Sequence, residues 1–330
     1  MLEAGAEMAA EQFELPVFVS AQKINKADFA DVSLQENENA VTVSGDGFSV
    51  AFDKKAGVMT SYKKGETEML LSGPVPNFWR APTDNDLGNN MQEWAKIWQD
   101  ATYNYSSNLS LKPTKSNDGV TYKVNYLLPN NEAKVEVKYT LKTDGSLNVH
   151  FSFTPNQKDL PNIPRLGIYM TLSNDFTDVS WYGKGETESY WDRKTGVKTG
   201  VYSGKIVDQF ERYLRPQETG NKTDVRWVEV TSPNVKLTAS STILLNTSVW
   251  PFDMTEIDFN RDDASESASG LVPVTKKHGA DIKIGNTVQW NIDYMQMGVG
   301  GDTSWGRLVH PEYTIPANKG YEYSFTIQPN

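Results

Sequence analysis

Apolar and polar residues alternate along much of the chain, with the period of two that is typical of β-strands. Residues 135–153 alternate on both sides of Asp144-Gly145, a pair that favours a tight hairpin turn because glycine tolerates a positive φ. Shorter alternating runs, bounded by Gly or Asn residues, lie at 41–52, 123–126 and 282–284. Strands at this spacing predict an all-β fold, a large antiparallel β-sandwich or barrel.

One segment has a helical period instead. Met91, Trp94 and Trp98 follow two Asn residues that are able to cap a first turn. We expect one short helix of about two or three turns there. No run rich in Pro, Gly and Ser divides residues 30–330, so a single large domain is the simplest interpretation.

The first 22 residues have a different character. Residues 9–19 are strand-like, but a lone strand cannot bury its apolar face. We interpret them either as the first strand of the large domain or as a strand cut from a preceding domain. Residues 1–16 contain four acidic and no basic residues, the reverse of a signal peptide. The location of the protein stays open between cytoplasm and periplasm.

Composition removes several classes of function. The 330 residues include 32 Lys and Arg against 42 Asp and Glu, a net charge of −10, which argues against nucleic acid as a partner. No apolar stretch approaches the about 18 residues of a membrane-spanning helix, so we expect no membrane partner. The absence of Cys excludes disulfides, thiolate nucleophiles and thiolate zinc sites.

Aromatic residues are the compositional feature most suggestive of function, with 9 Trp, 15 Tyr and 13 Phe. Sugars stack their flat C–H faces on such rings. Trp79 lies between two prolines in a stiff loop, and Trp305 lies in the glycine-rich segment 298–306. Loops on a rigid sandwich often carry binding groups. The more common use of Trp is packing, and both rings could instead plug the ends of the sandwich.

Acidic residues offer weaker candidates. On a strand, Glu186 and Glu188 would share one face at roughly 7 Å, close to the spacing of glycosidase carboxylate pairs. A solvated strand face or a structural hydrogen bond is the more common role of such a pair. Asp84-Asn85-Asp86 lacks the ligand pattern of a calcium loop, and we expect it to order its own loop by bonding backbone amides.

Four loop segments, taken together, resemble the C-terminal domain of the large family-2 β-galactosidases, which are glycoside hydrolases. They stand in the family's order over about 230 residues: NFWRAPTDNDLG (77–88), WYGKGETESYWDR (181–193), PQETGNKTDVRW (216–227) and MGVGGDTSW (297–305). Residues 3–16 resemble the end of the immunoglobulin-like domain that precedes this one. The resemblance therefore divides the chain into a tail, 1–22, and the C-terminal (small-chain) domain, 23–330.

The resemblance implies a fold and a site. The fold is the supersandwich shared with galactose mutarotases. The glycine-rich loop would stack Trp305, with Asp302 beside it, on the aglycone sugar of a galactoside such as lactose. The segment that contains Trp79, Arg80 and Asp84 would border the same site. These five residues are our predicted substrate-binding residues.

The resemblance also implies what lies elsewhere. In that family, the glutamates for retaining hydrolysis and the ligands of Mg²⁺ and Na⁺ belong to a (β/α)8 barrel, and this chain has no alternating strand–helix pattern. We expect no catalytic residue and no cofactor in this chain, and no hydrolysis by the chain alone. Its expected partners are the barrel of the same enzyme and a galactoside, and the complete enzyme is expected to be a homo-oligomer.

Two other functions stay open. One is a stand-alone carbohydrate-binding module, in which aromatic loops hold a galactoside without chemistry. The other is a mutarotase-like sugar isomerase, which would need a carboxylate base and a His acid. The candidates for the acid are His150, His278 and His310. The tail that resembles a preceding domain favours a truncated reading frame over a natural small subunit.

Overall fold

The computed structural model describes residues 9–15, 32–109, 113–116, 119–260, 264–266, 273–303 and 306–330. The described residues are mostly β-structure, so the predicted all-β class is confirmed. Among them, no helix is long and apolar enough to cross a bilayer.

The strands of the first half of the chain are β1 (Ser33–Glu36), β2 (Ala40–Gly45), β3 (Phe48–Asp53), β4 (Val58–Lys64), β5 (Thr67–Leu70), β6 (Ser72–Asn77), β7 (Ser106–Leu109), β8 (Thr114–Ser116), β9 (Gly119–Leu127), β10 (Ala133–Lys142) and β11 (Leu147–Pro155). Those of the second half are β12 (Arg165–Ser173), β13 (Asp178–Gly185), β14 (Lys198–Lys205), β15 (Lys222–Thr231), β16 (Lys236–Trp250), β17 (Ala264–Glu266), β18 (Pro273–Thr275), β19 (Thr287–Gln296) and β20 (Tyr321–Pro329).

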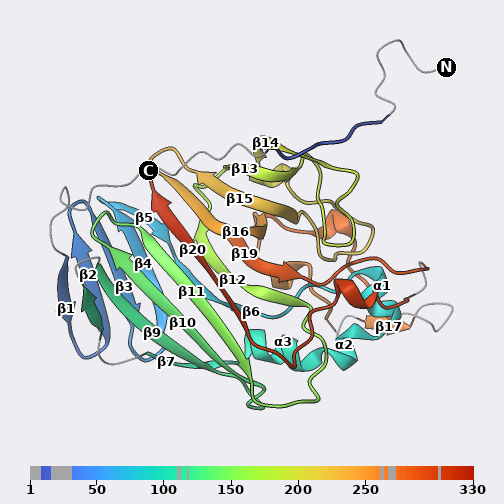
Figure 1. Cartoon of the computed structure of the whole chain (residues 1–330), viewed down its shortest axis with the longest axis horizontal. Helices are drawn as coiled ribbons and strands as arrows, with labels where there is room; N and C mark the ends of the chain where they lie inside the picture. The colour runs from blue at the N-terminus through green and yellow to red at the C-terminus, as the bar shows by residue number, and fades with distance from the viewer. Residues whose placement is uncertain are drawn as a thin grey trace, which may run out of the picture.

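The strands form two packed layers (Figure 1). One is the main path of a 13-stranded sheet, in the order β14-β13-β15-β16-β20-β11-β10-β9-β7. The other contains β6, β12 and β19, and the antiparallel meander β1 to β5 lies beside β6. The long strand β16 serves both layers, because Leu237–Ser240 pair with β20 while Asn246–Trp250 pair with β19. This pairing makes one continuous antiparallel sandwich.

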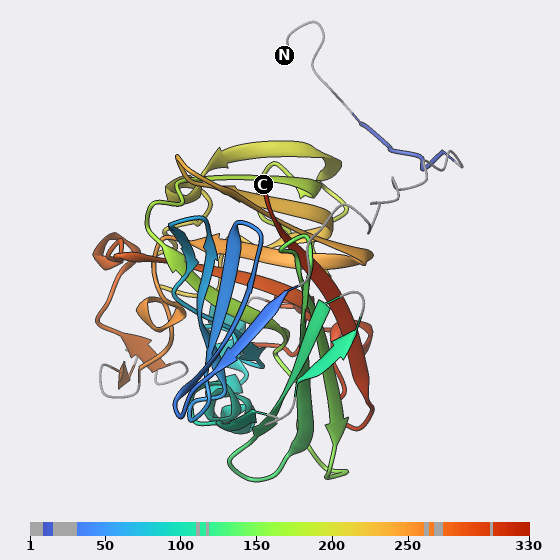
Figure 2. The ribbon, with the colours of Figure 1, turned by 90° about the vertical axis from the view of Figure 1, so that its left-hand side faces the viewer.

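Aromatic side chains join the meander to the large sheet. The ring of Phe52 lies 5.1 Å from that of Tyr122 and 5.5 Å from that of Tyr139. The hydroxyl of Tyr62 donates to the carbonyl of Gly145 at 2.5 Å, across the interface. Figure 2 shows the meander from its own side, beside the green strands. Alternating side chains therefore meet in a single core.

The predicted hairpin is confirmed. β10 and β11 pair antiparallel from Ala133↔Pro155 to Leu141↔Leu147, and Gly145 has a φ of +79° in the turn between them. The strands predicted at 41–52 and 123–126 are also confirmed, as β2, β3 and β9.

The strand predicted at 282–284 is wrong. These residues follow a 3-10 helix, η5 (Gly279–Asp281), and are not paired in a sheet. Side chains take their backbone groups instead: Arg212 donates to the carbonyl of Ile282 at 3.1 Å, and Glu256 accepts from the amide of Lys283 at 2.8 Å. The single N–H of Lys283 is thereby used and is not available to a ladder.

The helical segment holds three short helices rather than the single one predicted. They are α1 (Asp84–Gly88), α2 (Met91–Trp94) and α3 (Lys96–Tyr103), gathered at the end of the sandwich opposite the meander (Figure 1). Asn90 separates α1 from α2 with a left-handed φ of 61°, so it does not cap α2 with its side chain. α1 is the unpredicted helix, and Thr83 caps it together with Asp86.

The strand predicted over residues 9–19 is wrong for 9–15, which are exposed and not in a strand, and residues 16–19 lie outside the described residues. The side chain of Gln12 contacts the edge strand β14, where its Nε2 donates to the carbonyl of Thr199 at 2.8 Å.

Candidate active-site surface

The four loop segments lie at strand ends. The first follows β6, the second begins within β13 and continues past its end, the third leads into β15, and the fourth follows β19. Because these strands belong to one continuous sheet, segments distant in sequence come together beside α1. The described parts of all four meet there, around one pocket.

Arg80 joins two of the loop segments of this surface by hydrogen bonds. Its side chain is completely buried, and its guanidinium donates to both carboxylate oxygens of Asp86, at 2.9 and 3.1 Å. It also donates to the carbonyl of Gly298 at 2.8 Å and to that of Met297. Asp86 in turn accepts from the amide of Thr83 at 3.0 Å. Arg80 therefore fastens α1 to the beginning of the glycine-rich segment, which is a structural task.

Trp79 is also completely buried. Its indole Nε1 donates to the carboxylate of Asp258 at 3.0 Å, and Asp258 also accepts from Gln99 and Tyr103. Burial raises the pKa of Asp258, while the hydrogen bonds from Trp79 and Gln99 oppose that rise. The indole of Trp79 is therefore a packing group, the second of the two roles considered for it in the sequence analysis. It presents no face to solvent.

Asp84 is more accessible, with 70% of its side chain exposed. Arg215 donates to it from Nε at 2.8 Å, and Gln217 donates from Nε2 at 3.1 Å. The contact from Gln217 links the first loop segment to the third at the mouth of the pocket, and Arg215, directly before the third segment, adds to it. As expected for this acidic loop, Asp86 bonds a backbone amide of the loop itself. Asp84 does not, and bonds side chains instead.

The glycine-rich segment is held at its start by Asp192. The two carboxylate oxygens of Asp192 accept from the amides of Val299, at 3.0 Å, and Gly300, at 2.7 Å. A Cβ at position 298 would come within 2.6 Å of the same carboxylate, so the close approach requires glycine there.

Trp305 itself lies outside the described residues, but described residues before and after it in the sequence are held by hydrogen bonds. On one side, Asp302 Oδ1 lies 2.5 Å from Nε2 of His310. This contact lowers the pKa of Asp302 and raises that of His310. On the other side, the amide of Gly306 donates to Asn85 at 3.4 Å.

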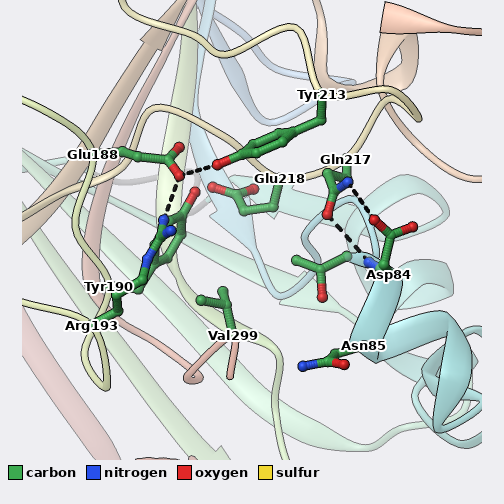
Figure 3. A pocket seen from close by; sticks show the side chains of 10 residues that line it. Asp84, Asn85, Glu188, Tyr190, Arg193, Tyr213, Gln217, Glu218 and Val299 are labelled. Atoms are coloured by element: carbon green, nitrogen blue, oxygen red, sulfur yellow. Dashed lines mark hydrogen bonds and ion pairs between the residues drawn. The ribbon is translucent and has the colours of Figure 1, made fainter. Parts of the chain in front are cut away.

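A pocket of about 280 Å³ opens between the loop segments (Figure 3). Its lining includes residues of all four segments: Thr83, Asp84 and Asn85, then Glu188, Tyr190 and Arg193, then Gln217 and Glu218, then Val299, with Tyr213 completing it.

Glu188 forms one wall of this pocket and is fully engaged in hydrogen bonds. It accepts from the amide of Gly220 at 2.7 Å, and also from Arg193 and the hydroxyl of Tyr213. It does not share a strand face with Glu186, because β13 ends at Gly185 and Glu186 is exposed. The paired spacing on a strand is therefore wrong, and the structural hydrogen bond is the role that the structure shows for Glu188.

The floor of the pocket rests on a buried group of charges. Nη2 of Arg165 donates to Oε1 of Glu218 at 2.8 Å, and Nε of Arg165 lies 3.3 Å from Asp293. Gln296 also donates to Oε1 of Glu218, at 3.3 Å. Burial raises the pKa of both carboxyl groups, that of Asp293 to about 7, and the nearby Arg165 opposes the rise.

Most of the chain matches a known protein family. Residues 44–327 match the family described as "Beta galactosidase small chain". The chain belongs to this family. The β-galactosidase of Priestia megaterium is 37% identical over 331 residues, covering 99% of this chain and 30% of the relative. That of Halalkalibacterium halodurans is 30% identical over 292 residues, covering 87% of this chain and 27% of the relative. The predicted β-galactosidase small-chain region is thus confirmed, and the chain spans about 30% of the length of such relatives.

Solved structures of sugar epimerases also align with this small-chain region. A putative aldose 1-epimerase from Escherichia coli aligns with a TM-score of 0.47 and 10% identity, over 91% of this chain and 99% of the other. Galactose 1-epimerase from Lactobacillus acidophilus aligns with a TM-score of 0.46 and 9% identity, over 91% and 98%.

The described part of the small-chain region offers no group of three or more Asp, Glu or His side chains able to hold a metal ion.

Sequence reasoning found the segments of this surface but missed most of its contributing side chains. Tyr190 and Glu218 lie inside the quoted segments, so the segments themselves were the available signal. Arg165 lies outside all four, and nothing in its local sequence distinguishes it from an exposed arginine. Of the five predicted binding residues, the structure places Asp84 in the pocket lining and Asp302 in the loop before Trp305, while Trp79 and Arg80 are buried beneath.

Proposed function

We propose that this chain is the C-terminal domain of a retaining family-2 β-galactosidase and completes the aglycone side of its active site. The anchoring of the glycine-rich segment on both sides of Trp305 supports the proposal. Asp192 and His310 hold the residues before Trp305, and Asn85 holds Gly306 after it. The described residues on either side of Trp305 are thus ordered before the substrate arrives.

In this proposal Trp305 supplies a flat apolar platform for the aglycone sugar of lactose or another terminal β-D-galactoside. Stacking moves no protons, so it positions the substrate without taking part in bond cleavage. The contact is worth about 1–2 kcal/mol, by analogy with other aromatic contacts. Asp302 orients the segment through His310.

Hydrolysis itself is assigned to the rest of the enzyme. The glutamates, Mg²⁺ and Na⁺ belong to its (β/α)8 barrel, which is the partner of this domain in a homo-oligomeric enzyme. Glu188 and Glu218 of this chain are held by Arg193 and Arg165, which fits a structural and binding role better than acid–base catalysis.

The test is Trp305→Ala in the complete enzyme. Loss of the platform should raise the KM for lactose roughly 5- to 30-fold, which corresponds to about 1–2 kcal/mol. Cleavage of an activated aryl β-galactoside should be largely retained, because the aryl group leaves readily without positioning. Trp305→Phe is the matched control and should recover most of the lactose KM. If Trp305→Ala abolished aryl cleavage, the platform role would be wrong.

A further inference from the structure

Two buried polar atoms at the floor of the pocket have no hydrogen-bond partner among the described residues. They are Oε2 of Glu218 and the hydroxyl oxygen of Tyr190, both in completely or almost completely buried side chains that line the pocket. Buried polar groups in native proteins are nearly always hydrogen-bonded, and an unmet one calls for an explanation. Two such atoms in the lining of one pocket indicate a ligand that bonds to them.

Both groups are fixed in place by the protein. Arg165 and Gln296 hold the other oxygen of Glu218, at 2.8 and 3.3 Å, which leaves Oε2 as the available acceptor. The guanidinium of Arg193 lies over the ring of Tyr190, 5.2 Å from its centroid. Figure 3 shows the carboxylate of Glu218 between Tyr190 and Tyr213. A site ordered in advance loses little entropy when its ligand binds.

The charges of the pocket favour an uncharged ligand. Each carboxylate of the lining has its own guanidinium: Glu188 has Arg193, Asp84 has Arg215, and Glu218 has Arg165. No cation of the described lining is left to neutralise a phosphate or carboxylate ligand, because Arg193 is the single basic residue there. The acceptor at Glu218 requires a hydroxyl or amine donor.

A sugar hydroxyl meets these requirements. One hydroxyl can donate to Oε2 of Glu218 and accept from the hydroxyl of Tyr190 at the same time. Val299 and the ring of Tyr213 add apolar contact beside these polar groups. The volume of about 280 Å³ lies just below the ~300 Å³ at which pockets for drug-sized ligands begin, which suits one pyranose ring.

We propose that this pocket binds a neutral monosaccharide unit, with Glu218 and Tyr190 as its polar contacts. The site is formed by this chain alone, so the proposal goes beyond the stacking role of Trp305 and stands or falls separately from it.

The test is calorimetric titration of the whole chain with D-galactose and D-glucose, with inorganic phosphate as an anionic probe. We expect a saturable signal with at least one of the sugars and none with phosphate. Tyr190→Phe removes only the unpartnered hydroxyl, so it should weaken sugar binding roughly tenfold, the loss of about one hydrogen bond. The folded state should keep or gain thermal stability, because an unmet polar atom is removed.

Tyr122→Phe is the matched control. Its hydroxyl is also buried without a partner among the described residues, but it is not among the residues that line this pocket. Sugar affinity should be unchanged in this variant. The proposal would be overturned by the absence of sugar binding up to tens of millimolar, by binding of phosphate alone, or by an equal loss of affinity in both variants.

Discussion

Trp79 shows how far a single residue can be interpreted from sequence. A tryptophan between two prolines in a loop suggested a binding platform, with packing as the alternative. The structure gives packing, because Asp258, 179 residues away, accepts its indole hydrogen. No local pattern contains that partner. Asp192 is a second example, since its carboxylate bonds two amides more than 100 residues away. Residue roles that depend on distant partners could not be predicted from the chain.

The ion pair of Asp302 and His310 makes a testable prediction at the residue scale. Its hydrogen bond and charge raise the pKa of His310, and Glu312 adds to this at 3.7 Å. In an NMR titration, Asp302→Asn should return the pKa of His310 toward the ordinary ~6.5. Glu312→Gln, the control, should lower it less. An unchanged His310 pKa in Asp302→Asn would contradict the pairing.

The same pair has a defined pH window. The pKa of His310 is raised, so its stabilising contribution is complete below ~6.5 and is lost as pH rises through the raised value. The pKa of Asp302 is lowered, so its contribution is complete above ~3.9 and is lost as pH falls through the lowered value. The segment that carries Trp305 should therefore be held best between about pH 4 and 6.5.

At the scale of elements, the alternation of apolar and polar residues predicted strands correctly where only one face of the strand is buried. β10 alternates buried and partly exposed residues along its whole length, and its hairpin with β11 was predicted with the correct turn. Most residues of β19 are buried on both faces, because it lies between β12 and β16 in the interior layer. Such a strand has little alternation to detect. The helical segment was located, but its division at Ala95 and the additional helix α1 before Asn90 were not predicted.

The turn of this hairpin supports a second prediction. Gly145→Ala would place a Cβ 2.9 Å from the ring of Phe48 at a φ of +79°. Positive φ alone costs an L-residue about 1–2 kcal/mol, and the contact adds to it. The free energy of unfolding in urea should fall by at least that amount. Gly196→Ala, where a Cβ meets nothing within 4 Å, should change it by less than about 0.5 kcal/mol. Equal effects of the two substitutions would contradict this account of the turn.

At the scale of the whole molecule, the sequence contained the four segments but not the way in which they meet. Their convergence depends on the order β6-β12-β19-β16-β15-β13, which joins strands far apart in sequence. Pairings of that range are set by the packing of the complete sandwich. The pocket and its unpartnered atoms therefore became visible only in the folded chain.

The completing role predicts the behaviour of the purified chain. Alone, it should not hydrolyse an aryl β-galactoside, because the proposed catalytic groups belong to the barrel. Mixed with a fragment that carries the barrel, it should restore hydrolysis in proportion to the amount bound. A mixture containing unfolded chain is the control. Hydrolysis by the chain alone would contradict the assignment of the catalytic groups to the barrel.

The position of β20 has a consequence for synthesis in the cell. This strand lies between β16 and β11, where Asn148 bonds the carbonyl of Phe325, 177 residues later. At about 5–20 residues per second, a ribosome needs roughly 10–35 s to supply that neighbour. Until then the nascent chain carries two bare strand edges in the middle of its future sheet, the kind of surface that recruits other chains. Chaperone protection of the nascent chain matters most during this interval.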